Sequence, residues 1–178
     1  ASLTGRDYRE FIKNKVFIKF LLWLEKTIYK NSSAIIAGSP GQADGVKTVY
    51  SSKPLIVIPN SCDIDTFSPA IDGSEIRQKY GWHNKLVFLH AGAMGKVNSL
   101  DFVVEAAKRL KDEKDIHFVL LGDGNQRQIL EEKIKSLKLN NIEMLPSVSK
   151  KDMPVFFAAA NVGLVIIGNY PIIEHNSA

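Results

Sequence analysis

The chain has 178 residues, 45% of them hydrophobic and 24% charged, which is typical of a globular protein with a substantial buried core. Its net charge of +4 arises within residues 6–30, where seven basic residues stand against three acidic ones, and the rest of the chain is neutral. A charge confined to one segment argues against nucleic-acid binding, and no stretch is long and apolar enough to predict a membrane-spanning helix.

The single cysteine and the four histidines indicate no redox or metal chemistry. Cys62 has no partner for an internal disulfide, which fits a reducing compartment, and we expect a cytoplasmic protein. The histidines lack the spacing of metal ligands, so we expect neither a metal nor another cofactor. His90 follows an apolar run and has no identifiable carboxylate partner, and we expect it to make a structural hydrogen bond rather than to take part in catalysis.

Residues 8–30 predict a basic amphipathic helix with a break near Asn14. Its apolar stripe has lysines alongside and includes Phe17, Phe20, Leu21, Leu24 and Ile28. One interpretation is a helix packed on a sheet, with its lysines in solvent. The other is peripheral contact with an anionic membrane surface, anchored by Trp23 and the lysines, and the two can hold on different faces.

The next part of the chain predicts two short strands and a linker. Apolar strands are expected at residues 33–39 and 54–59, and between them a serine N-cap followed by proline begins a helix over 40–50. Residues 60–69 are polar and end in a proline, which favours a linker. We therefore expect a domain boundary within residues 60–84.

Strands and helices alternate after this boundary. Apolar runs that suit buried strands occupy residues 86–91, 116–121, 142–145 and 162–167. Helical spacing occupies residues 99–112, 125–137 and a short segment after Ser149, with expected buried faces of Phe102, Val103, Ala106, Ala107 and Leu110 in the first helix and of Ile129, Leu130, Ile134 and Leu137 in the second. This alternation predicts a parallel sheet in a Rossmann-like, doubly wound α/β fold.

Two glycine turns follow the first two of these strands. Gly92 and Gly95 lie in the first turn, and the second turn, Gly122-Asp123-Gly124, precedes a helix that carries Arg127. Both should open at the carboxyl edge of the sheet, where a phosphate would meet backbone N–H groups, Lys96 and Arg127. Neither turn fits the dinucleotide fingerprint or the P-loop. The alternative interpretation is two ordinary turns, with the aspartate as a helix cap.

Five longer motifs follow one another along the chain. They are V-I-P-N-S-C-D-I-D-T-F-S-P at residues 57–69, L-H-A-G-A-M-G-K-V-N-S at 89–99, G-D-G-N-Q-R-Q-I-L at 122–130, N-I-E-M-L-P-S-V at 141–148 and A-N-V-G-L at 160–164. In order and spacing they resemble the second half of a retaining GT-B glycosyltransferase of family 4 (group 1), of the kind that builds bacterial surface polysaccharides. That family's patterns are V-I-P-N-G-V-D-x-x-x-F-x-P, L-x-x-A-G-x-x-x-x-x-K-G, G-x-G-x-x-R-x-x-L, N-V-x-F-L-G-x-V and A-D-V-x-L.

The resemblance implies two Rossmann-like domains that face a cleft. Residues 1–60 would be the tail of the N-terminal acceptor domain with the linker, and residues 61–178 a partial C-terminal domain that binds a nucleotide-sugar donor. The implied reaction transfers a sugar from that donor to a lipid-linked or polysaccharide acceptor, in the biosynthesis of surface polysaccharide such as lipopolysaccharide. The implied place is the cytoplasm, with peripheral contact at the inner face of the membrane.

The resemblance also implies roles for individual residues. The donor diphosphate would lie near Gly92, Ala93, Met94, Gly95, Lys96 and Arg127. The donor pocket would further include Gly122, Asp123 and Gly124, with the base beside Ser147 and Val148 and the donor sugar near a loop that begins at Glu174. Ala93 and Asn98 occupy the positions where many members carry a basic pair.

We expect this chain to be a fragment that is inactive alone, because the glutamate that would hold the donor ribose and the histidine of the acceptor domain are absent from it. Two alternatives remain open: a nucleotide-sugar epimerase of the same fold, and a non-catalytic binding module. A sheet that stops after Ile167 would leave a strand edge uncovered, which predicts self-association through that edge.

Overall fold

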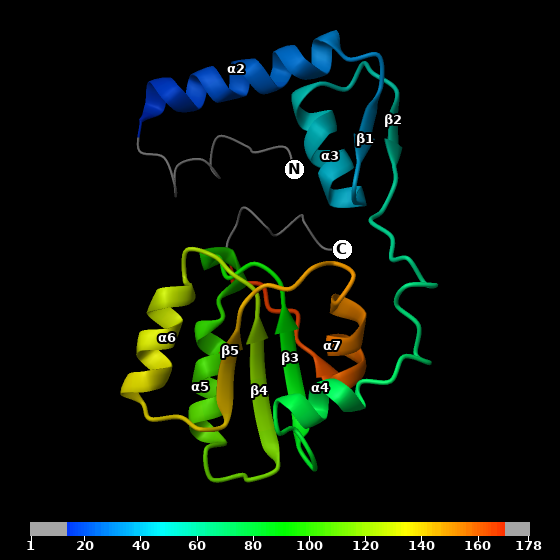
Figure 1. Cartoon of the computed structure of the whole chain (residues 1–178). Helices are drawn as coiled ribbons and strands as arrows, with labels where there is room; N and C mark the ends of the chain where they lie inside the picture. Colours follow the sequence, from blue (N-terminus) through cyan, green and yellow to red (C-terminus); the bar gives the residue numbers. More distant parts are fainter. Residues whose placement is uncertain (1–13, 170–178) are drawn as a thin grey trace. The chain divides into compact units, whose positions relative to one another are not determined.

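The computed structural model describes residues 14–169, and Figure 1 shows their path. These residues form two compact units, one of residues 14–62 with Asn169 and the other of residues 63–168. No helix in this described part is both long and apolar enough to cross a membrane.

The first unit contains two helices and a pair of short parallel strands. In chain order these elements are α2 (Lys15–Asn31), β1 (Ile35–Ala37), α3 (Pro40–Val49) and β2 (Leu55–Val57). Asn14 is the N-cap of α2, and its Oδ1 accepts hydrogen bonds from the N–H groups of Val16 and Phe17 at 3.0 and 3.2 Å. The predicted helix is therefore confirmed from Lys15 onward, whereas residues 8–13 lie outside the described range.

The second unit contains a four-stranded parallel sheet, which confirms the predicted fold class. Its strands are β3 (Leu86–Ala91), β4 (Ile116–Leu121), β5 (Ile142–Leu145) and β6 (Val162–Gly163), in the spatial order β5-β4-β3-β6. Leu86 pairs with Ile116 and Ala91 with Leu121, so β3 and β4 end level with each other. The turns that follow these two strands consequently start side by side at one edge of the sheet.

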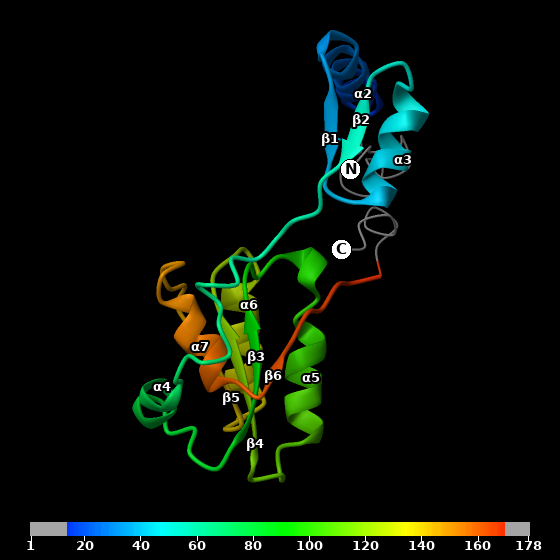
Figure 2. The same ribbon diagram turned by 90° about the vertical axis from the view of Figure 1, so that its right-hand side faces the viewer.

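Helices cover both faces of this sheet (Figures 1 and 2). On one face lie α5 (Asp101–Arg109) and α6 (Arg127–Ser136), and on the other α4 (Ser74–Lys79) and α7 (Met153–Ala159). Along β4, Phe118 and Leu120 join the core cluster below α5 and α6, whereas Val119 and Leu121 join the cluster below α4 and α7. Burial of both faces explains the continuous apolar runs of these strands.

Four details of the second unit differ from the sequence-based expectation. The helix α4 lies within the expected boundary region 60–84, where no helix was predicted. The side chains of Phe102 and Ile129, expected in the core, are 68% and 53% exposed, because α5 and α6 turn other apolar residues to the sheet. The last strand is limited to Val162–Gly163, although Leu164 still donates its N–H to the Leu89 carbonyl oxygen at 2.7 Å.

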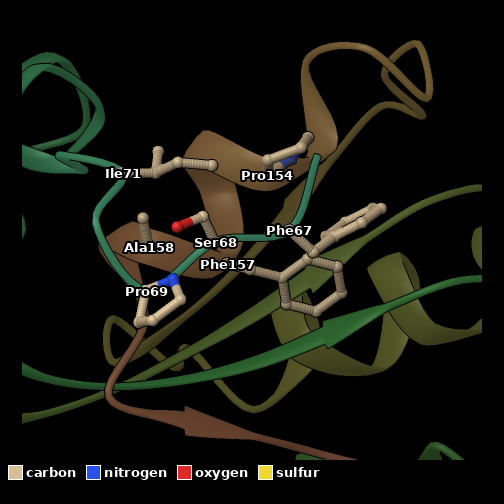
Figure 3. A pocket seen from close by; sticks show the side chains of 7 residues that line it. All are labelled: Phe67, Ser68, Pro69, Ile71, Pro154, Phe157 and Ala158. Atoms are coloured by element: carbon tan, nitrogen blue, oxygen red, sulfur yellow. The ribbon is translucent and has the colours of Figure 1, made fainter. Parts of the chain in front are cut away.

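The second half of the expected linker packs against α7. Figure 3 shows residues of the segment 67–71 on one side of a hollow of about 340 Å³ and residues of α7 on the other. The rings of Phe67 and Phe157 meet edge to face, with centroids 5.9 Å apart. This segment is therefore part of the second unit.

Candidate functional site

The two glycine turns form one paired structure at the carboxyl ends of β3 and β4. The Gly92 N–H donates to the Leu121 carbonyl oxygen at 2.9 Å, and the Met94 N–H donates to the Asp123 carbonyl oxygen at 2.8 Å. Strand pairing thus continues beyond the sheet into both turns. The structure brings together the two predicted turns, and we call residues 92–98 and 122–126 the turn pair.

Close packing within the turn pair explains two of its glycines. A Cβ atom on Gly122 would lie 1.9 Å from the Gly92 carbonyl oxygen, and one on Gly124 would lie 2.5 Å from the Met94 carbonyl oxygen. Neither position can hold a larger residue unless the turns move apart. These glycines are required by packing whether or not a ligand binds above them.

Arg127, predicted to contact a diphosphate, is bonded inside the protein. Its Nη1 donates to the carbonyl oxygens of Gly122 and Leu145 at 2.7 and 3.0 Å, and its Nε lies 2.9 Å from the Glu131 carboxylate. The guanidinium therefore joins the ends of β4 and β5 and fixes the second turn. Direct contact between Arg127 and phosphate stays a prediction.

The first turn is also held by its own hydrogen bonds. Asn98 Oδ1 accepts the Gly95 N–H at 3.3 Å, so the asparagine at the expected lysine position closes the loop. The Met94 side chain is fully buried in the core, and its N–H and carbonyl both bond within the turn pair. Gly168 ties the loop from the other side, since its N–H donates to the Val97 carbonyl oxygen at 2.8 Å.

Two groups suited to an anion lie at the surface of this first turn. Ala93 is exposed, and within residues 14–169 its N–H has no hydrogen-bond partner. Lys96 is exposed at the start of the 3₁₀ turn Lys96–Asn98. An exposed backbone N–H group and a nearby lysine are groups that bind phosphate in other loops that follow a strand.

The remaining predicted residues lie in three different settings. Asp123 is exposed, and its Oδ1 accepts the Gly124 N–H at 2.7 Å. Ser147 and Val148 follow β5 at the same edge as the turn pair, the serine exposed and the valine packed against the core below α7. Glu174 lies outside the described residues. No group of three or more His, Cys, Asp or Glu side chains in the described part is placed to hold a metal ion.

His90 is the last buried residue of β3, one position before the strand ends at Ala91. Its Nδ1 lies 3.3 Å from the Leu164 carbonyl oxygen, which links β3 to the segment after β6. The hydrogen bond expected from the sequence is present. Its second ring nitrogen lies beside the turn pair, a placement that the sequence pattern could not show.

The region that carries these features matches a known family. Residues 72–168 match the family model described as Glycosyl transferases group 1. This chain belongs to the group 1 glycosyltransferases. The match covers the four-stranded sheet and the whole turn pair, which confirms the resemblance expected from the motifs.

A curated relative supports the same family. The chain is 30% identical over 115 residues to the putative colanic acid biosynthesis glycosyl transferase WcaI of Escherichia coli (strain K12). The matched part is 63% of this chain and 28% of that protein. The chain therefore spans little more than a quarter of this relative's length.

The solved structures that resemble this chain show that it has part of a GT-B fold. The chain is 23% identical to HepE of Anabaena, solved in complex with UDP-glucose, with a TM-score of 0.68 over 82% of this chain and 41% of that one. It is 17% identical to sucrose-phosphate synthase of Thermosynechococcus elongatus, with a TM-score of 0.70 over 93% of this chain and 42% of that one. WaaG, a glycosyltransferase involved in lipopolysaccharide biosynthesis, gives a TM-score of 0.62 at 20% identity over 74% of this chain and 37% of that one.

Proposed function

We propose that the second unit binds the diphosphate of a nucleotide-sugar donor at the turn pair, as part of a glycosyltransferase. The observation that carries the proposal is the hydrogen-bonded pair of glycine turns at the carboxyl ends of neighbouring parallel strands, where such sheets bind ligands. HepE, which has the same fold, was solved with UDP and with UDP-glucose. WcaI and WaaG, named for colanic acid and lipopolysaccharide biosynthesis, support transfer to a lipid-linked or polysaccharide acceptor.

The roles that we propose follow from the geometry. The Ala93 N–H and the Lys96 ammonium would bind phosphate oxygens directly, and they would stabilise the charge that develops on the departing nucleoside diphosphate. Gly122, Gly124 and Arg127 would act by holding the turns in place. Ser147 and Val148 would lie beside the base, one strand further along the same edge.

Lys96 offers a direct test of donor binding. We expect Lys96→Ala to weaken the binding of UDP-glucose or GDP-mannose by roughly tenfold in calorimetry, since it removes one charge-assisted hydrogen bond. Lys111→Ala is the matched control, because this lysine lines a hollow at the opposite end of the sheet. Absence of binding by the unmodified chain would refute the proposal. Epimerisation or hydrolysis of the donor without acceptor would favour the epimerase, and binding without turnover fits a module that needs the rest of the enzyme.

We also propose that α2 contacts an anionic membrane surface. Within the described helix only Ile18 is buried, whereas large apolar side chains are exposed over a broad face: Val16, Phe17, Phe20, Trp23, Leu24 and Ile28. Beside this face, on one side of the helix, stands a row of exposed lysines: Lys15, Lys19, Lys26 and Lys30. Apolar rings next to a cationic row fit the boundary between acyl chains and anionic headgroups.

Tryptophan fluorescence reports this contact directly. Trp23 is 61% exposed whereas Trp82 is 1% exposed, so a blue shift on adding vesicles comes from Trp23. We expect the shift with vesicles containing phosphatidylglycerol and a weaker one with phosphatidylcholine alone. The double variant Lys19→Glu, Lys26→Glu should abolish the difference, and a spectrum unchanged by either vesicle would refute membrane contact.

A further inference from the structure

His90 presents an unused hydrogen-bonding atom beneath the turn pair. The side chain is 5% exposed, and its Nε2 is buried without a hydrogen-bond partner among residues 14–169. Buried polar atoms normally have a partner, and the exceptions concentrate at sites that bind ligands or store strain. His90 lies near the end of β3, two residues before Gly92 of the proposed diphosphate site.

The hydrogen bond of the other ring nitrogen decides what Nε2 can do. Nδ1 lies 3.3 Å from the carbonyl oxygen of Leu164, and a carbonyl oxygen only accepts hydrogen bonds. The proton of the neutral ring is therefore on Nδ1, which leaves a lone pair on Nε2. This atom is suited to accept a hydrogen bond from a hydroxyl group, whereas an ionised phosphate oxygen, itself an acceptor, is the wrong partner for it.

The side of Gly92 that would carry a Cβ atom faces this ring edge. A Cβ atom built on Gly92 would lie 3.8 Å from His90 Nε2 and 3.9 Å from His90 Cε1. Apart from Gly92 and its two neighbours in sequence, no other atom of the described residues would lie within 4 Å of it. The imidazole edge therefore lies within van der Waals distance of the backbone of the first turn at Gly92. A side chain at position 92 would contact this edge of the ring.

We propose that His90 Nε2 accepts a hydrogen bond from a hydroxyl group of the bound nucleotide sugar. The inference rests on the proposed donor site at the turn pair and extends it to the donor's sugar groups. The donor carries hydroxyls on both sides of its diphosphate, on the ribose and on the transferred hexose, so either sugar is a candidate partner for Nε2. His90 would thus select for a hydroxylated sugar in a set orientation.

Two substitutions separate this role from the structural one. His90→Asn keeps an amide N–H that can donate to the Leu164 carbonyl oxygen but has no atom at the position of Nε2. His90→Gln places an amide oxygen near the position of Nε2. His83→Asn is the matched control, because His83 is exposed in a loop before β3.

We expect His90→Asn to weaken the binding of UDP-glucose or GDP-mannose by about threefold to tenfold in calorimetry, which corresponds to one neutral hydrogen bond. His90→Gln should recover part of the loss, and His83→Asn should bind as the unmodified chain does. If the parent nucleotides UDP and GDP keep their affinity for His90→Asn, the hydroxyl belongs to the hexose. An equal loss for the parent nucleotides assigns it to the ribose.

The failures are distinguishable. If the unmodified chain binds but His90→Asn changes no affinity, the assignment of His90 is wrong and the proposed donor site stands. If the unmodified chain binds none of these nucleotides, both proposals fail together. Should His90→Asn not fold, nitrogen NMR of the unmodified chain decides: the Nε2 resonance should shift when the sugar nucleotide is added, and an unchanged resonance would overturn the assignment.

Discussion

The substitution Gly122→Ala should separate the turn pair. Its Cβ atom would lie 1.9 Å from the Gly92 carbonyl oxygen, whereas ordinary contact begins at 3.4 Å, so the turns must move apart by about 1.5 Å. That movement breaks the bonds from Gly92 N–H to Leu121 and from Met94 N–H to Asp123. These bonds contribute about 1 kcal/mol each. The backbone conformation of Gly122, at a φ of 145°, adds about 1–2 kcal/mol of strain for alanine.

Together these terms predict a loss of about 3–4 kcal/mol in the free energy of unfolding and a fall of roughly 15–25 °C in the melting temperature of the second unit. The assay is denaturation followed by the fluorescence of the buried Trp82, in a Trp23→Phe background. Gly163→Ala is the control, because a Cβ atom there meets nothing within 4 Å. Equal stability of the two alanine variants would refute the packing argument.

Three further predictions concern other parts of the second unit. Arg127→Ala should cost about 2–3 kcal/mol of stability, because it leaves the carbonyl oxygens of Gly122 and Leu145 without their charged donor, and denaturation measures it; stability retained with donor binding lost would show that Arg127 contacts the ligand instead. The pKa of Asp72 is held below its ordinary value because the carboxylate accepts hydrogen bonds from the hydroxyl and the N–H of Ser74. The ionised Asp72 carboxylate therefore contributes its full stabilisation above the ordinary pKa of an aspartate, and this stabilisation is lost as the pH falls through the lowered pKa. In denaturation experiments the free energies of unfolding of the wild type and of Asp72→Asn should differ at neutral pH and converge in acid. Self-association through the segment after β6, where Val165 and Ile167 are 89% and 57% exposed, should appear as a dimer in sedimentation and be weakened by Val165→Asp; a monomer at all concentrations would contradict it.

The strands could be predicted because their sequences carry the consequence of burial. Both faces of β3 and β4 are covered, so their residues are apolar in succession and the turns that end them are visible as glycines. The helix α4 could not be predicted, because its six residues include only one large apolar side chain, Ile76. Contacts with residues distant in the sequence support it, such as the bond from Arg77 Nη1 to the Ala159 carbonyl oxygen at 2.5 Å.

The position of the two turns in the sheet could be predicted from the sequence, but the structural roles of their residues could not. The order of strand, glycine turn and helix predicted both turns at the carboxyl edge of the sheet, where the structure has them. The pattern did not show that Gly122 and Gly124 are required by contact with the other turn, because that contact depends on the register between β3 and β4. The pattern also could not show that Arg127 donates hydrogen bonds to backbone carbonyl oxygens, because the sequence of a helix is the same whether its basic side chain contacts a ligand or the protein backbone.

The guanidinium that joins β4 to β5 has a consequence for how this protein can vary. Its bond to the Leu145 carbonyl oxygen fixes the chain two residues before Ser147, and the bond involves only backbone on that side. Ser147 is exposed, so its side chain can change without disturbing that attachment. Ser147 is thus a position that can vary beside a fixed attachment. On the proposal that the base lies beside Ser147, a library directed at altered nucleotide preference can be confined to that position, while the turn pair keeps its shape.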